Sequence, residues 1–269
     1  MKRRVLLAVV VPVLAWSFAA CDDAESVTTI LDAAETTLES GSAGFELRVA
    51  VEGSQQIPDG EITGSGAASY EDPKLMHGTF DFGALPVGTI EVIVDERFAY
   101  MRGPAFAGFA GDAATWLRVD LTSTDATAQE LQGLVSGQND ASLLLYYLFG
   151  ADGEIESLGT ETIGGVEATG YGVSVDLDEA LARVPEEARE ALELNLDGFT
   201  EGGVAHVLDA EVWIDDEGFV RRLVFVYELG AEVGDGQIGV TSDLSAFGEP
   251  VVVEVPSDDL VVDVEDVAA

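Results

Sequence analysis

The stretch FELRVAVE (residues 45–52) alternates between apolar and mostly polar side chains with a period of two. Phe45, Leu47, Val49 and Val51 occupy the apolar positions. Successive side chains of a β-strand point to opposite faces of a sheet, so this pattern predicts a strand with one buried face.

Similar alternation recurs along the rest of the chain in two groups. The first group comprises residues 62–70, 75–82, 89–95, 98–102 and 115–121, and the second comprises residues 155–161, 166–177, 207–215, 219–229 and 237–247. Turn signals such as Pro58-Asp59-Gly60 and Gly164-Gly165 separate neighbouring runs. Because short connections join antiparallel neighbours, the first group is predicted to form an antiparallel meander. In the second group, residues 155–161 and 166–177 are predicted to form a hairpin, and residues 207–215, 219–229 and 237–247 a second meander.

Helical spacing of apolar residues predicts helices over residues 26–38, 125–135, 141–149 and 178–194. The last helix is expected to kink or restart at Pro185. Residues 251–266 are predicted to be extended and then acidic. One strongly curved antiparallel sheet with helices over one face, an α+β fold, accommodates these elements. No Pro/Gly/Ser-rich linker longer than a loop divides the chain, so residues 21–269 are predicted to form a single domain.

The first 20 residues have the form of an export signal. Met1-Lys2-Arg3-Arg4 precedes an almost entirely apolar run over residues 5–18, and two alanines follow. The run is shorter than the about 20 apolar residues that a transmembrane helix needs, and Pro12 interrupts it. Residues 1–20 are therefore predicted to be a signal peptide.

The ending Phe18-Ala19-Ala20-Cys21 resembles the bacterial lipobox, with Phe where Leu is commoner. Cys21 is the single cysteine of the chain, so it has no partner for an intramolecular disulfide. Cys21 is predicted to receive diacylglycerol and to hold the protein to the extracytoplasmic face of the cell membrane. An ordinary cleaved signal followed by an incidental thiol is the alternative.

Acidic residues dominate the composition, with 51 Asp and Glu against 12 Lys and Arg and a formal net charge of −39. Removal of residues 1–20, which carry three basic residues and no acidic one, changes this charge to −42. Phosphate binding needs clustered Lys and Arg, so a nucleic-acid partner is excluded. Hydrophobic residues make up 47% of the chain, which argues against a disordered protein.

No catalytic or metal-binding constellation stands out, and no cofactor is predicted. GDGQIG (residues 234–239) matches the dinucleotide-binding glycine pattern, but a predicted strand follows it where that pattern requires a helix. His77 and His206 lie far apart in sequence and have no cysteine ligand beside them. The turn DDEG (residues 215–218) lacks the alternating acids of a calcium loop. We therefore expect a protein that is not an enzyme.

Four sequence phrases occur in a fixed order: TWLRVDLT (115–122), GTETIGGVEATGYGVSVDL (159–177), VWIDDEGFVRRLVF (212–225) and FGEPVVVEVPSDD (247–259). Together with the lipobox, this order resembles the actinobacterial lipoproteins of the LppX/LprG type, relatives of the periplasmic lipoprotein carrier LolA. The resemblance runs from about residue 21 to residue 262. It implies a LolA-like fold, an open half-barrel whose concave face is covered by helices. It also implies a lipid or glycolipid ligand held in that cavity.

A ligand with acyl chains needs a broad apolar concave face. The residues predicted to line this face are the inward strand positions Phe45, Leu47, Val49, Phe80, Phe82, Ile90, Val92, Val94, Phe98, Tyr100, Leu223, Phe225 and Tyr227, with Leu144, Tyr147 and Leu148 as a helical lid. The alternative is that the same residues close a solid core, because periodicity does not distinguish a filled space from an open one.

Two functions fit these expectations. The first is a membrane-anchored carrier that moves a lipid or glycolipid within the cell envelope, with an envelope transport partner. The second is a lipid-anchored interaction or envelope-sensing module without a transported ligand. A cavity large enough for acyl chains favours the carrier, and a filled cavity favours the module.

Overall fold

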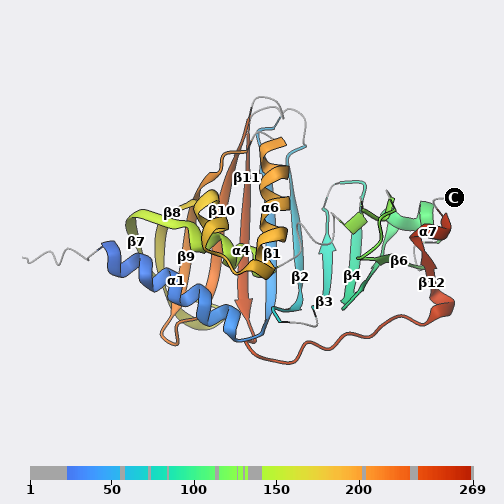
Figure 1. The fold of residues 1–269 in the computed structure, drawn as a ribbon, viewed down its shortest axis with the longest axis horizontal. Helices are drawn as coiled ribbons and strands as arrows, with labels where there is room; N and C mark the ends of the chain where they lie inside the picture. The colour runs from blue at the N-terminus through green and yellow to red at the C-terminus, as the bar shows by residue number, and fades with distance from the viewer. Residues whose placement is uncertain are drawn as a thin grey trace, which may run out of the picture.

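Figure 1 shows the fold in a computed structural model, which describes residues 23–54, 58–71, 74–83, 85–112, 115–125, 127–129, 131–132, 141–201, 204–230 and 236–267. One open sheet of 12 strands runs through the molecule in the order β12-β6-β5-β4-β3-β2-β1-β11-β10-β9-β8-β7. The strands are β1 (Ser42–Glu52), β2 (Gly60–Ser69), β3 (Leu75–Asp81), β4 (Thr89–Asp95), β5 (Phe98–Arg102), β6 (Trp116–Asp120), β7 (Ala151–Ile163), β8 (Val166–Asp176), β9 (Val207–Asp215), β10 (Val220–Leu229), β11 (Gly236–Ser245) and β12 (Val261–Asp263).

Strand β1 joins two meanders into this sheet. It pairs antiparallel with β2, the next strand of the first meander, and with β11, the last strand of the second. The remaining neighbours are also antiparallel, except that β12 runs parallel to β6. The two predicted meanders and the predicted β7–β8 hairpin are thereby confirmed as parts of a single curved sheet, and the predicted α+β fold class is correct.

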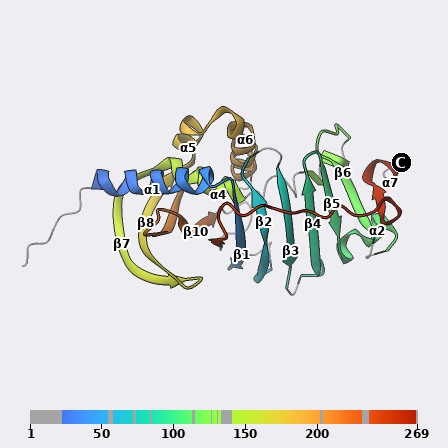
Figure 2. The ribbon, with the colours of Figure 1, turned by 90° about the horizontal axis from the view of Figure 1, so that it is seen from below.

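Helices pack on one side of the second meander. They are α1 (Asp23–Glu39), α4 (Ala141–Tyr147), α5 (Leu177–Arg183) and α6 (Glu186–Glu201), with the 3-10 helix η2 (Leu148–Gly150) between α4 and β7. α1 contacts β7, β9 and β10 and also contacts α4 and η2, while α6 contacts α4 and α5. Figure 2 shows β7 and β8 bending into an arc, with α1 lying across it and α5 and α6 on the same side of the sheet.

Small elements close the other end of the sheet. They are η1 (Pro104–Phe106), α2 (Ala107–Ala110), η4 (Asp258–Leu260) and α7 (Val264–Val267). Residues 246–257 run without regular structure along the strand ends from β11 to η4 and β12 (Figures 1 and 2). The predicted extended segment over 251–266 is thus interrupted by η4, resumes as β12 and ends where α7 begins at Val264.

The other predicted elements agree with the structure within a few residues, except that the helix predicted over 125–135 lies largely outside the described residues. The largest difference among the strands is β7, which begins at Ala151 and not at residue 155. The helix predicted over 178–194 is divided into α5 and α6, because Val184 precedes Pro185 and takes an extended backbone with ψ 152°. Gly164 and Gly165 both have positive φ, as the predicted β7–β8 hairpin turn requires.

The register assigns every strand residue to one of two faces, because residues that pair across strands share a face. Phe45 pairs with Gly66, which pairs with Gly78, which pairs with Val92. We call this side the apolar face. We call the opposite side, which carries Glu46 and its cross-strand neighbours, the polar face. The buried apolar residues beneath the helices and those of the first meander form one contiguous core.

Candidate functional site

The structure places most of the predicted lining residues together on the apolar face. Phe80 pairs with Ile90 across β3 and β4. On the other side of β1, Val49 pairs with Val240, which pairs with Phe225. The residues that share this face are Phe45, Leu47, Val49, Phe80, Ile90, Val92, Val94, Leu223, Phe225 and Tyr227, and Phe82 packs against the same core just after β3.

The three residues predicted to form a lid pack onto this face from α4 and η2. Tyr147 is 2% exposed, and its ring meets that of Phe225 edge to face with 5.6 Å between centroids. Leu148 is completely buried, whereas Leu144 is half-buried. At this point the helical layer fills the space above the sheet with its own side chains.

Phe98 and Tyr100 were placed on the wrong face. Val94 pairs with Ala99, so the residues that share its face on β5 are Ala99 and Met101. Phe98 and Tyr100 lie on the polar face, where the guanidinium groups of arginines cover them. Arg97 and Arg118 both lie over the Phe98 ring, at 5.3 and 5.2 Å from its centroid. Stacked arginines make an aromatic side chain stable on a polar surface, so the alternation within this strand did not identify its buried face.

Two aromatic rings of the apolar face lie low against β2 and β3. The rings of Phe45 and Phe80 stack with 6.2 Å between centroids and an interplanar angle of 25°. A Cβ atom on Gly64 would lie 2.5 Å from the Phe80 ring, and one on Gly66 would lie 2.9 Å from the Phe45 ring. Glycine at these positions removes the side chains that would lift the rings, so the apolar surface is lowered here.

The apolar face is filled unevenly. Beneath α1 and α4, Leu223 is 1% exposed and Phe225 is fully buried. Where β1, β2, β3 and β11 approach one another, the apolar side chains stay partly exposed. We call this half-buried set the apolar rim; it consists of Leu47, Val49, Ile62, Phe82, Ile238 and Val240. Three rim residues, on β2 and β11, were missed by the sequence prediction, although they also sit at alternating apolar positions.

Two buried tyrosines show how apolar the filled part is. Burial raises the pKa of the Tyr147 hydroxyl well above its ordinary value. The pKa of Tyr227 is also raised, first by burial and then by the neighbouring Tyr147. Both side chains are therefore neutral at any physiological pH and offer no charge to a ligand.

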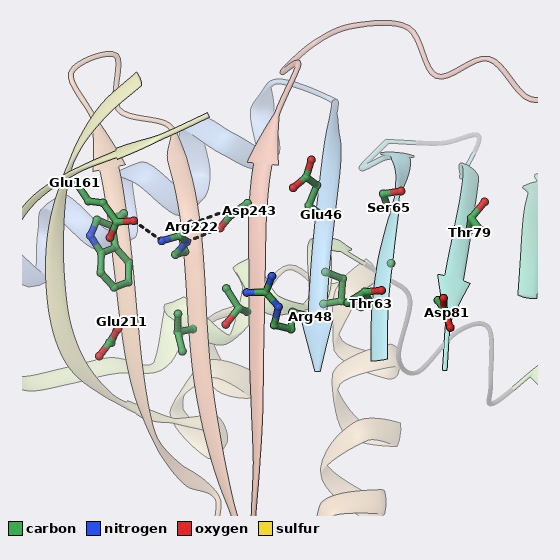
Figure 3. A pocket seen from close by; sticks show the side chains of 15 residues that line it. Glu46, Arg48, Thr63, Ser65, Thr79, Asp81, Glu161, Glu211, Arg222 and Asp243 are labelled. Atoms are coloured by element: carbon green, nitrogen blue, oxygen red, sulfur yellow. Dashed lines mark hydrogen bonds and ion pairs between the residues drawn. The ribbon is translucent and has the colours of Figure 1, made fainter. Parts of the chain in front are cut away.

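A hollow lies on the polar face. It has a volume of about 790 Å³ and crosses from β7 and β9 to β3 (Figure 3). We call it the polar groove; it is lined by Glu46, Leu47, Arg48, Thr63, Gly64, Ser65, Thr79, Asp81, Glu161, Glu211, Trp213, Arg222, Val224, Thr241 and Asp243. A twisted sheet is saddle-shaped, so the face away from the helices can also be hollowed. Leu47 alone of the predicted lining residues belongs to this groove.

Ion pairs fix one end of the polar groove. The Nε and Nη2 atoms of Arg222 donate to the two carboxylate oxygens of Asp243 at 2.5 and 2.7 Å, and Nη1 donates to Glu161 at 2.8 Å. These bonds raise the pKa of Arg222 further above its already high value. The Trp213 ring closes this end, packed with Ile163 and Val224 in a small separate apolar cluster.

The motifs set aside in the sequence have structural roles. β11 begins at Gly236, so the described part of GDGQIG is an antiparallel strand and not a helix start. The Asp215 carboxylate accepts bonds from the amides of Glu217 and Phe219 and pairs with Arg221, which stabilises the DDEG turn. His77 lies exposed on β3, and His206 contacts Asp178 at 3.2 Å. Cys21 lies outside the described residues.

Comparisons with known proteins support the fold. No protein-family model matches the sequence, and no curated protein is significantly similar to it. Among solved structures, LprF from Mycobacterium bovis matches with a TM-score of 0.50 and 14% identity over 87% of this chain and 98% of its own. The lipoprotein LppX from Mycobacterium tuberculosis matches with a TM-score of 0.49 and 17% identity over 87% and 100% of the two chains. The match to LprF confirms the predicted resemblance at the level of fold.

No helix within the described ranges, which begin at residue 23, is both long and apolar enough to cross a membrane.

Proposed function

We propose that this chain is an exported lipoprotein that binds a lipid or glycolipid on its apolar face and carries it within the cell envelope. In this proposal Cys21 is acylated and holds the protein to the outer side of the cell membrane, and an envelope transport partner receives the ligand. The proposal assigns binding and carriage to the chain, and no catalytic step.

The observation that carries the proposal is the apolar rim. Half-buried Leu47 and Ile238 pack against the buried core, and half-buried Val49 shares their face, beside the low rings of Phe45 and Phe80. Burying apolar surface contributes roughly 25 cal/mol per Å², so an acyl chain laid on the rim gains stability from surface that the protein has left in water. The closely packed part beneath α4 then serves as the floor against which the chain ends.

The interaction-module alternative draws on that same closely packed part. Tyr147 and Leu148 fill the space above Phe225, so a ligand cavity is not built there in the form that the sequence predicted. The carrier proposal therefore requires that acyl chains occupy the side of β1, β2 and β11 and not that of β9 and β10.

A matched pair of substitutions tests this placement. Val49 and Val226 are both half-buried valines of central strands, but Val49 lies on the apolar face and Val226 on the polar face. A carboxylate facing acyl chains is poorly solvated, so Val49→Glu is expected to weaken binding of a fluorescent acyl probe at least tenfold while Val226→Glu leaves it unchanged. Lipids extracted from protein purified from its own host, identified by mass spectrometry, should show a stoichiometric species. Absence of both lipid and probe binding in the folded wild type would favour the interaction module.

The anchor is tested separately. Cys21→Ser should abolish incorporation of labelled fatty acid, and it should release the protein from the membrane fraction or leave it as an uncleaved precursor. Equal labelling and equal membrane retention of the mutant would overturn the lipoprotein part of the proposal and leave the acyl-binding part standing.

A further inference from the structure

The polar groove lies on the side of the sheet that faces away from the helices and the apolar rim (Figure 3). Its volume of about 790 Å³ falls in the range of about 300–1,000 Å³ that small-molecule sites occupy. Its floor crosses six consecutive strands of the sheet, from β9 to β3, so the hollow is long and runs across the strands. This shape suits a chain-like ligand better than a compact one.

Several hydrogen-bonding side chains in the groove have no role inside the protein. Within the described chain, the side chains of Glu46, Thr63, Ser65, Glu211 and Thr241 make no hydrogen bond and no ion pair. They come from β1, β2, β9 and β11 and stand on the same face. Hydroxyl groups both donate and accept, and carboxylates accept, so this row offers both kinds of bond to a ligand.

The charges of the groove argue against a charged polymer. Five carboxylates line it, so a polyanion would be repelled. Two guanidinium groups also stand in its floor. That of Arg222 is paired with Asp243 and Glu161, whereas Arg48, near the middle, has a side chain that is 62% exposed and lies 3.4 Å from Glu61 at the surface. A polycation would have to bury its charges against these arginines. A metal ion is also a poor candidate, because the described residues contain no group of three or more His, Cys, Asp or Glu that could hold one.

We propose that the polar groove binds a neutral oligosaccharide. Sugar hydroxyl groups donate to the carboxylates of Glu46 and Glu211, and sugar oxygens accept from Thr63, Thr241 and Arg48. No net charge is required for any of these bonds. This site is independent of the proposed lipid site, because its free side chains lie on the opposite face of the same strands.

Tryptophan fluorescence measures binding at this groove directly. Beyond residue 20 the chain contains only Trp116 and Trp213, and Trp116 lies at the far end of the sheet on β6. In a Trp116→Phe background, Trp213 reports on the groove alone. The processed lipoprotein in phosphatidylcholine vesicles would be titrated with oligosaccharides of dextran, mannan and arabinogalactan. We expect a saturable change with at least one of them, unaltered between low and high salt.

Two neighbouring carboxylates of β9 provide the matched variants. Glu211 lines the groove, whereas Asp209 is exposed on the same face outside it. Glu211→Gln should weaken oligosaccharide binding about tenfold, because a charge-assisted hydrogen bond becomes a neutral one, and Asp209→Asn should not change it. Thr63→Val with Thr241→Val should weaken it further, with acyl-probe binding preserved in every variant.

Three results would overturn the proposal. The first is the absence of a saturable signal from any of the three sugars at millimolar concentration. The second is equal weakening by Glu211→Gln and Asp209→Asn. The third is binding of decalysine in place of the sugars, with the steep salt dependence of an ionic contact, which would make the groove a site for cationic ligands.

Discussion

The two parts of the apolar face are built from the same kind of strand but are covered differently. Over β9 and β10, α1 and α4 lie directly on the sheet, and Phe225 keeps no exposed surface. Over β1, β2 and β11, the rim residues Val49 and Ile238 stay half-buried, and glycines hold the aromatic rings low. An alternating strand therefore specifies that a face is apolar, and the helices placed over it determine whether that face is filled. Four predictions test this contrast, from the largest expected effect to the smallest.

Tyr147→Ala is expected to have the largest effect, because it removes a ring from the filled part. Tyr147 is 2% exposed and packs edge to face on Phe225. Truncating a large buried aromatic side chain costs about 3–5 kcal/mol of the free energy of unfolding. Urea denaturation would measure it, with Tyr146→Ala as the control, because Tyr146 is a half-buried neighbour on the same helix. Equal losses of unfolding free energy in the two variants would show that α4 does not fill the space above the sheet at this point.

Gly66→Ala tests the glycine surface beneath the rings. A Cβ atom at this position would lie 2.1 Å from the backbone oxygen of His77 and 2.9 Å from the Phe45 ring. The strands must shift to accept it, which we expect to cost about 1–3 kcal/mol, as overpacking generally does. Gly172→Ala is the control, since its nearest contact would be an ordinary 3.5 Å to Glu156. A tolerated Gly66→Ala would mean that the rings do not need to lie low.

Val49→Ala compares the stability cost of a rim residue with that of a buried residue on the same apolar face. Val92, on the same face, is 4% exposed, whereas Val49 is half-buried. Each buried methylene contributes about 0.8 kcal/mol, so Val92→Ala should cost about 1.5 kcal/mol or more and Val49→Ala about half of that. The two unfolding midpoints provide the measurement. A Val49→Ala loss as large as that of Val92→Ala would indicate that the rim is already packed.

The smallest effect is expected from salt, which screens repulsion between charged side chains and leaves the packing of the apolar face unchanged. The mature chain carries a formal net charge near −42, so self-repulsion should destabilise it in dilute buffer. The melting temperature is expected to rise between dilute buffer and molar NaCl, by about 2–4 °C for each kcal/mol of repulsion that is screened. A flat or falling melting temperature would show that the ion pairs of the sheet already compensate the excess acid.

The sequence predicted the positions of helices and strands well, but it predicted less well on which face of the sheet a side chain lies. Strand β4 was placed correctly by its alternation, and so was the side on which Val92 and Val94 lie. The error at Phe98 and Tyr100 arose at the β4–β5 turn, where the pairing places Ala99 opposite Val94. A shift of one residue across a turn exchanges the two faces, and the turn length that sets it is not visible in the period of either strand.

The candidate sites divide in the same way. The lid and the lining residues were predicted to enclose one cavity. In the structure Tyr147 packs into the space above Phe225, whereas the side chain of Val49 remains half-buried. Both residues have the apolar spacing that the prediction used, and only the position of α4 and α6 over the sheet distinguishes them. The polar groove had no signal of its own, because Glu46 and Thr63 are ordinary outward residues until the sheet twists and gathers them into one hollow.

The lipobox at Cys21, the acidic charge, the alternating strands and the break at Pro185 follow from the order of residues along the chain, because each depends on near neighbours. The pairing of β1 with β11, the face of Phe98, the exposed rim and the groove required the folded molecule. These features depend on which distant segments meet and in what register, and that is determined by the packing of the whole sheet against its helices.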